Sequence, residues 1–150
     1  MVSKKKNNEY LIFKVLEQEF AIDLDQSREI LEMKNLTPVP DSPEYISGII
    51  KVRDQIIPIV DLGKKMNLKS ETDKNKVIII SMQDVLIGLL VEEILEIKKV
   101  DKINKSDVLK SSQKVDRAFI EGILTLNEKL VIVIDTKKLF DNFNLEMALD

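Results

Sequence analysis

Two aspartates, Asp61 and Asp135, have the positions best suited to chemistry. Each follows an apolar run, and they occupy equivalent places in two similar stretches that begin 74 residues apart (119 − 45). Two such carboxylates could form an acid/base dyad, so a small hydrolase is one hypothesis. Alternatively, each carboxylate caps the short helix predicted directly after it, because aspartate accepts hydrogen bonds from the first N–H groups of a helix. We favour capping, since the sequence supplies neither an orienting base nor a set of oxyanion donors.

A second acidic group, Glu92, Glu93 and Glu96, could hold a hard cation through its carboxylate oxygens. The stretch lacks the glycine-containing, oxygen-rich loop that such sites use, so a solvated face of a strand or helix is favoured. The chain has no cysteine and no histidine, which excludes disulfides, thiol chemistry and the commonest metal ligand. Its four glycines are too dispersed for a phosphate-binding loop. We expect no metal, no cofactor and no enzymatic activity.

Arg53 points to a different kind of chemistry, the recognition of a partner protein. Period-2 alternation puts Lys51 and Arg53 on one face of a predicted strand. Ile49 shares this face, whereas Ile50 and Val52 point to the other. An arginine beside an apolar side chain on an outward face is typical of an interface patch. From these residues alone, an ordinary exposed strand face is an equally good interpretation.

The stretch around Arg53 occurs twice in the chain. Residues 45–62 read YISGIIKVRDQIIPIVDL, and residues 119–136 read FIEGILTLNEKLVIVIDT, with no gap in the alignment. Asn127 takes the place of Arg53 in the second copy. The similarity continues upstream at an offset of 67 residues (87 − 20). Because the offset grows from 67 to 74, the second half holds seven extra residues, which fit in the polar run between Lys98 and Arg117. An internal repeat of this length predicts two related structural units.

Strands dominate the predicted secondary structure. Each copy of the repeat reads as a strand, a polar break and a second strand, and alternating or β-branched runs precede it. Further strands are expected at residues 10–16, 20–24, 77–80 and 85–91, while residues 92–100 fit a strand or a helix. The strands lie too close together in the sequence for βαβ crossovers, so the fold class is mainly β.

Polar segments divide the chain into predicted units. Residues 1–8 are expected to form a flexible tail, and residues 69–76 a linker between the halves. The first unit is placed at 9–75 and the second at 76–141, followed by a C-terminal helix at 142–150. The first strand could join either unit. Each half has a marginal core of its own, so the halves should share an interface and unfold together.

Single residues give local expectations within these units. Asp25 is predicted to cap one helical turn over residues 25–29. Gly48 suits a bend or a close backbone approach at the entry to its strand. Pro58 lies inside an apolar strand and has no N–H to donate, so its position should be an edge or a bulge.

Composition excludes several classes of protein. The 150-residue chain has a net charge of −3 with both signs mixed along the sequence, whereas a nucleic-acid-binding protein usually shows an excess of basic residues. No apolar run approaches the roughly 18 residues of a membrane span. The N-terminus has no apolar stretch long enough for a signal peptide. We expect a soluble, cytoplasmic protein that neither inserts into membranes nor binds nucleic acid.

Several stretches together resemble the CheW family of chemotaxis coupling proteins. YISGIIKVRDQIIPIVDL is similar to the signature of that family. FAIDLDQSREI, VPDSPEYISG, IGLLVEEILEI and FIEGILTLNEKLVIVIDTKKLF match further family segments in the same order, so the similarity covers nearly the whole chain. The resemblance implies two SH3-like five-stranded β-barrels packed around a shared core, with short helices and no enzymatic activity.

The same resemblance implies a function. Family members couple methyl-accepting chemoreceptors to a CheA-type histidine kinase, pair with the CheW-like regulatory domain of that kinase and form rings under receptor arrays. We therefore expect the chain to bind this kinase domain and the cytoplasmic tip of the receptors, and to be recruited to membrane-bound receptor arrays. A coupling protein of a non-flagellar motility array is an alternative.

The resemblance also assigns partner contacts to Arg53 and Glu29. Three nearby positions depart from the family pattern, because Lys51 replaces an asparagine, Asp54 replaces a glycine and Ser27 replaces an apolar residue. The expected protein-interaction surface comprises Ser27, Glu29, Ile30, Gly48, Ile49, Lys51, Arg53, Asp54 and Pro58. None of these residues is expected to be catalytic.

Overall fold

A computed structural model of the chain describes residues 8–68, 74–82, 84–101, 103–104 and 117–140. The strands are β1 (Glu9–Val15), β2 (Gln18–Asp23), β3 (Ser27–Glu32), β4 (Ile46–Val52), β5 (Gln55–Asp61), β6 (Lys76–Met82), β7 (Val85–Val91), β8 (Glu93–Lys99), β9 (Ile120–Leu126) and β10 (Lys129–Ile134). The helices of these residues are single turns: the 3-10 turns η1 (Leu24–Gln26) and η3 (Arg117–Phe119), and the α-helical turns α1 (Leu62–Lys65) and α2 (Thr136–Leu139). The predicted C-terminal helix and nearly all of the predicted tail lie outside the described residues.

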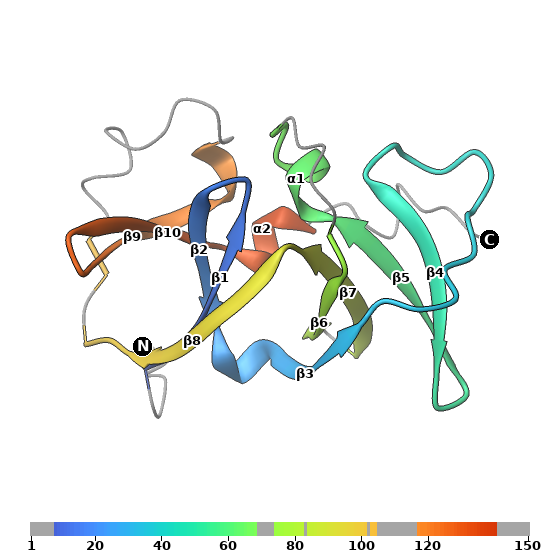
Figure 1. Cartoon of the computed structure of the whole chain (residues 1–150), viewed down its shortest axis with the longest axis horizontal. Coiled ribbons are helices and arrows are strands. Elements are labelled where there is room, and N and C mark those ends of the chain that lie inside the picture. The colour runs from blue at the N-terminus through green and yellow to red at the C-terminus, as the bar shows by residue number, and fades with distance from the viewer. Residues whose placement is uncertain (1–7, 69–73, 83, 102, 105–116, 141–150) are drawn as a thin grey trace.

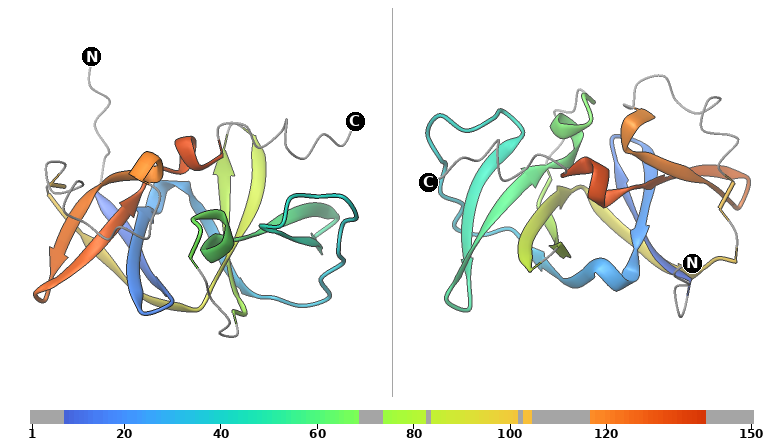
Figure 2. Two further views of the ribbon diagram at one scale, coloured as in Figure 1. Left: turned by 90° about the horizontal axis from the view of Figure 1, so that it is seen from above. Right: turned by 180° about the vertical axis from the view of Figure 1, so that it is seen from behind.

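The strands form two five-stranded sheets that lie side by side (Figures 1 and 2). Sheet A has the strand order β8-β1-β2-β10-β9, and sheet B the order β3-β6-β7-β5-β4. Neighbouring strands are antiparallel except β2 with β10 and β5 with β7, which are parallel. The predicted mainly β fold is confirmed, and these two mixed sheets are consistent with SH3-like barrels.

Each sheet takes strands from both halves of the sequence. The β1–β2 hairpin pairs with the later strands β8 and β10 in sheet A, whereas the β6–β7 hairpin pairs with the earlier strands β3 and β5 in sheet B. Each copy of the repeat thus lends its first hairpin to the sheet of the other copy. The predicted division at residues 75 and 76 therefore differs from the division of the strands between the sheets. A linear boundary cannot describe this reciprocal exchange.

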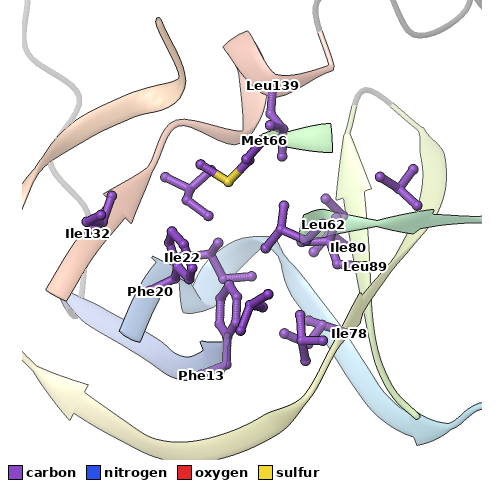
Figure 3. Close-up of a cluster of buried hydrophobic side chains, with 14 of the residues drawn as sticks. Phe13, Phe20, Ile22, Leu62, Met66, Ile78, Ile80, Leu89, Ile132 and Leu139 are labelled. Carbon is purple, nitrogen blue, oxygen red and sulfur yellow. The ribbon is translucent and has the colours of Figure 1, made fainter. Parts of the chain in front are cut away.

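Strand alternation divides the core into three clusters. On β1, Leu11 and Phe13 point into a cluster shared by the two sheets, whereas Tyr10 and Ile12 pack within sheet A. β6 alternates in the same way between the shared cluster and the interior of sheet B. The rings of Phe13 and Phe20 stack in the shared cluster with centroids 5.9 Å apart (Figure 3). Burying both faces of a strand explains its continuous apolar run.

Local details clarify three expectations. η1 is a 3-10 turn whose cap is Asp23, which accepts a hydrogen bond from the Asp25 N–H at 3.0 Å, so the predicted cap at Asp25 is wrong by two residues. The ambiguous stretch after residue 92 is the strand β8. Ile49 of β4 lies opposite Pro58 of β5. The backbone N–H and carbonyl of Ile49 are both hydrogen-bonded to Thr37 instead. Pairing of β5 with β7 begins only after Pro58, which agrees with the predicted edge position.

Candidate interaction surface

Asp61 and Asp135 are both engaged at the starts of the short helices. Oδ1 of Asp61 accepts a hydrogen bond from the backbone N–H of Lys64 at 3.2 Å, and Oδ1 of Asp135 accepts one from Lys138 at 3.2 Å. Oδ2 of Asp61 also lies 3.6 Å from Nζ of Lys74, whose side chain is 5% exposed. These contacts are those of helix N-caps, so the capping interpretation is confirmed. The hydrolase alternative is not favoured by this geometry.

Two of the three glutamates of the second acidic group, Glu92 and Glu93, have structural contacts. Oε2 of Glu92 accepts a hydrogen bond at 2.8 Å from the backbone N–H of Leu16, which lies in the tight turn between β1 and β2. Glu93 forms an ion pair with Lys14 at 3.7 Å. Among the described residues, no three acidic, histidine or cysteine side chains are grouped so as to hold a metal ion. None of the helices in the described part of the chain has the length and apolar character needed to span a membrane.

Arg53 lies in the turn between β4 and β5, outside the strand. Its φ is 47° and that of Asp54 is 70°, the left-handed pair of a type I′ hairpin turn. The predicted strand alternation therefore ends at Val52, because β4 ends there. The Arg53 side chain nevertheless reaches solvent and is 71% exposed. Asp54 fits this turn because aspartate tolerates the left-handed conformation better than most residues.

The guanidinium group of Arg53 is held by Glu29. Nη2 of Arg53 donates to both carboxylate oxygens of Glu29, at 2.7 Å each. Glu29 lies on β3, so the ion pair joins one edge strand of sheet B to the hairpin turn at the other edge. A pair with an arginine this exposed contributes about 0.2–1 kcal/mol to folding. Breaking the pair to bind a partner would therefore cost little stability.

An open groove of about 850 Å³ adjoins the ion pair. Its walls are β3, the segment 34–37 that follows β3, and the β4–β5 hairpin. Ile30 and Ile56 line this β3–β4 groove and are 42% and 66% exposed, which is unusual for large aliphatic side chains. Lys51 lies directly opposite Ile56 in the strand register and gives the groove a positive charge. A groove that combines exposed isoleucines with charged side chains has the composition of a protein-binding site.

Most of the predicted surface residues come together here. Ile30, Ile49 and Lys51 line the groove. Glu29 and Arg53, which form the ion pair, are each adjacent in the sequence to a lining residue. The structure thus unites residues that are 24 positions apart in the sequence.

The remaining predicted residues support this surface from outside the groove lining. Gly48 has a φ of 152°, and a Cβ there would lie 2.4 Å from the carbonyl oxygen of Thr37. Glycine is thus required for the backbone bridge that holds the segment after β3 against β4. Ser27 begins β3 opposite Ile80, and Asp54 completes the hairpin turn. Pro58 is half-buried in β5.

Ile56 is the main groove residue that sequence reasoning missed. It lies in the apolar run after the polar break, a pattern that is typical of a strand buried on both faces. In the structure Ile57 is buried and Ile56 faces outward. The charge of its cross-strand neighbour Lys51 was the available signal, because residues directly opposite each other in a sheet share a face.

The second copy of the repeat keeps the backbone of this surface but not its ion pair. Asn127 occupies the place of Arg53 in an equivalent left-handed turn, with a φ of 52°. Glu96, the counterpart of the glutamate in the pair, is exposed. Ile97 and Leu130, the counterparts of the two exposed groove isoleucines, are 55% and 53% exposed. The charged pair therefore distinguishes sheet B from sheet A.

Comparison with known proteins agrees with this architecture. Residues 9–144 match the family model described as a CheW-like domain. The chain is 30% identical to a protein named Chemotaxis protein CheW from Thermotoga maritima, over 94% of this chain and 93% of that protein. It is 29% identical to Chemotaxis protein CheW of Bacillus subtilis, over 96% and 94% of the two chains.

A solved structure supports the same assignment. The crystal structure of the scaffolding protein TtCheW from Thermoanaerobacter tengcongensis superimposes with a TM-score of 0.82 at 27% identity, covering 100% of this chain and 98% of that one. The family model spans both sheets and the β3–β4 groove. The chain belongs to the CheW family.

Proposed function

We propose that the chain is a non-catalytic adaptor that couples methyl-accepting chemoreceptors to a CheA-type histidine kinase. Membership of the CheW family supports this function, as do the names of its chemotaxis relatives and of its scaffolding neighbour. The observation that carries the proposal is the exposed β3–β4 groove with the Glu29–Arg53 pair beside it. The adaptor would act in the cytoplasm, at the tips of membrane-bound receptors.

The groove is the proposed binding site for the CheW-like regulatory domain of the kinase. Ile30, Ile49 and Ile56 offer apolar area that water covers in the isolated chain. Covering such area is worth roughly 25 cal/mol per Å², so apolar side chains of the partner would gain by entering the groove. Lys51 and the ion pair would set the orientation of the partner, because charges at a rim give specificity more than affinity.

The Glu29–Arg53 pair gives the surface two possible arrangements. When the pair is closed, both carboxylate oxygens of Glu29 accept from Nη2 of the guanidinium group. A partner carboxylate would bind Arg53 in exchange for Glu29, and the exchange costs little because the arginine side of the pair is 71% exposed. An arginine can present two parallel donors to a carboxylate, which lysine cannot do. We propose Arg53 as the orienting contact of the groove.

Isothermal titration calorimetry with the isolated regulatory domain of a CheA-type kinase tests this assignment. The wild-type chain should bind, and Ile56→Glu should abolish binding because it places a charge in the apolar groove. Leu130→Glu is the matched control, since Leu130 has a similar exposure and lies at the equivalent position of sheet A. Loss of binding only in the Leu130 variant would place the kinase on the other sheet and overturn the proposal.

A further inference from the structure

The two α-helical turns carry a group of lysines that the groove does not use. We call these residues the lysine face: Lys64 and Lys65 on α1, and Lys137 and Lys138 on α2. Met66, directly after α1, and Leu139 of α2 are buried in the same shared cluster, where Figure 3 shows them close together. Both helical turns therefore pack against the cluster that the two sheets share.

Backbone and ring contacts connect the two helices further. The backbone N–H of Asp61 donates to the Tyr45 carbonyl at 2.7 Å, and that of Asp135 donates to the Phe119 carbonyl at 2.9 Å. Nζ of Lys65 lies 4.1 Å from the ring centroid of Tyr45 and 5.7 Å from that of Phe119. One ammonium group thus contacts both aromatic residues that adjoin the helix caps. These cation–π contacts hold its charge in place between the two helices.

Within the described part of the chain, no carboxylate pairs with three of the four lysines of this face. Lys64, Lys137 and Lys138 are exposed, and none of them has a side-chain ion pair or hydrogen bond with another described residue. The described carboxylates nearest in the sequence, Asp61 and Asp135, are occupied as helix caps. Three exposed cations without an ion-pair partner among the described residues therefore lie on the same two helical turns as Lys65, on a chain whose net charge is −3.

We propose that the lysine face binds an acidic segment of a partner protein, at a site separate from the β3–β4 groove. Carboxylates of such a segment would form charge-assisted hydrogen bonds with the exposed ammonium groups of Lys64, Lys137 and Lys138. Because the lysines are spread over α1 and α2, they suit an extended segment with several acidic side chains. A long polyanion such as DNA would also meet the negative remainder of the surface, which opposes its binding. This inference does not depend on the adaptor function, because it concerns the isolated chain.

A fluorescein-labelled oligoglutamate peptide is the probe that tests the inference, with fluorescence anisotropy as the readout. We expect binding at low salt that weakens as salt is added. Lys137→Glu with Lys138→Glu should lower the affinity by about tenfold or more. The control is Lys98→Glu with Lys99→Glu, which changes the same net charge at two adjacent exposed lysines on β8. The control should lose less than about threefold.

Two results would overturn the proposal. Equal losses in the two double variants would show that only net charge matters. Tighter binding of duplex DNA or of anionic phosphatidylglycerol vesicles than of the peptide, with the same dependence on Lys137 and Lys138, would identify a different class of partner. Should the glutamate variant fail to fold, which a melting curve reveals, Lys137→Gln with Lys138→Gln removes the charges without adding repulsion, and its unchanged affinity would equally refute the proposal.

Discussion

Replacing Arg53 by asparagine should separate the role of this residue in binding from its role in folding. Asparagine tolerates the left-handed turn conformation and already occupies the equivalent turn at Asn127. Only the ion pair with Glu29 is lost, and a pair with an arginine 71% exposed is worth about 0.2–1 kcal/mol. For a chain of this size that corresponds to a fall in Tm of at most about 2–4 °C.

Binding of the kinase regulatory domain should respond far more strongly. If Arg53 is the orienting contact of the groove, its removal costs about 2 kcal/mol, or roughly 30-fold in affinity. Arg53→Glu should be worse, because it adds repulsion from Glu29 and from the partner carboxylate. Calorimetric titration measures the affinity, and a melting curve of the same samples measures the stability. Asn127→Ala, in the other copy, should bind like wild type.

The charge swap Arg53→Glu with Glu29→Arg gives the sharpest control. It keeps an ion pair between β3 and the turn, so stability should return to that of wild type. The charges that a partner meets are reversed, so binding should stay weak. Restored binding in the swap would mean that the pair only fixes the backbone of the groove. A loss of less than about threefold in Arg53→Glu, with normal melting, would show that Arg53 is merely solvated.

Further predictions concern the groove, the caps and the exchanged hairpins. Ile56→Glu should leave Tm nearly unchanged in a melting experiment, because the side chain is 66% exposed. Asp61→Ala should lower the free energy of unfolding by about 3 kcal/mol or more in urea titration, since it strands a buried ammonium group as well as removing a cap. Asp135→Ala should cost only about 1 kcal/mol, and equal costs would contradict the importance of the buried pair. The fragment 76–150 should show no cooperative transition on heating, because its first hairpin belongs to sheet B; a cooperative melt would contradict the shared core.

The repeat in the sequence was sufficient to predict two related β units, because apolar periodicity and turn residues are local signals. The caps at Asp61 and Asp135 were also predictable, since an aspartate between a strand and a helical turn has few other roles. The hairpin exchange was not predictable in this way. It depends on the parallel pairs β2–β10 and β5–β7, which join segments far apart in the chain and leave no local pattern.

The candidate site was predicted residue by residue but not as a geometry. Glu29 and Arg53 were both singled out, yet nothing local shows that their side chains meet across sheet B. Arg53 was placed in the strand and not in the turn, because Arg-Asp is a less familiar type I′ pair than Asn-Gly. Ile56 was not singled out, because an apolar run does not say which of its two faces is covered.

Receptor-dependent kinase activity tests the adaptor function most directly. Purified CheA-type kinase and receptor assemblies are mixed with and without the chain, and autophosphorylation of the kinase is followed by phosphate incorporation. The chain should raise the rate only when receptors are present, and Ile56→Glu should remove the increase while the protein stays folded. An unchanged rate on addition of wild-type chain, or full stimulation by the groove variant, would contradict the account.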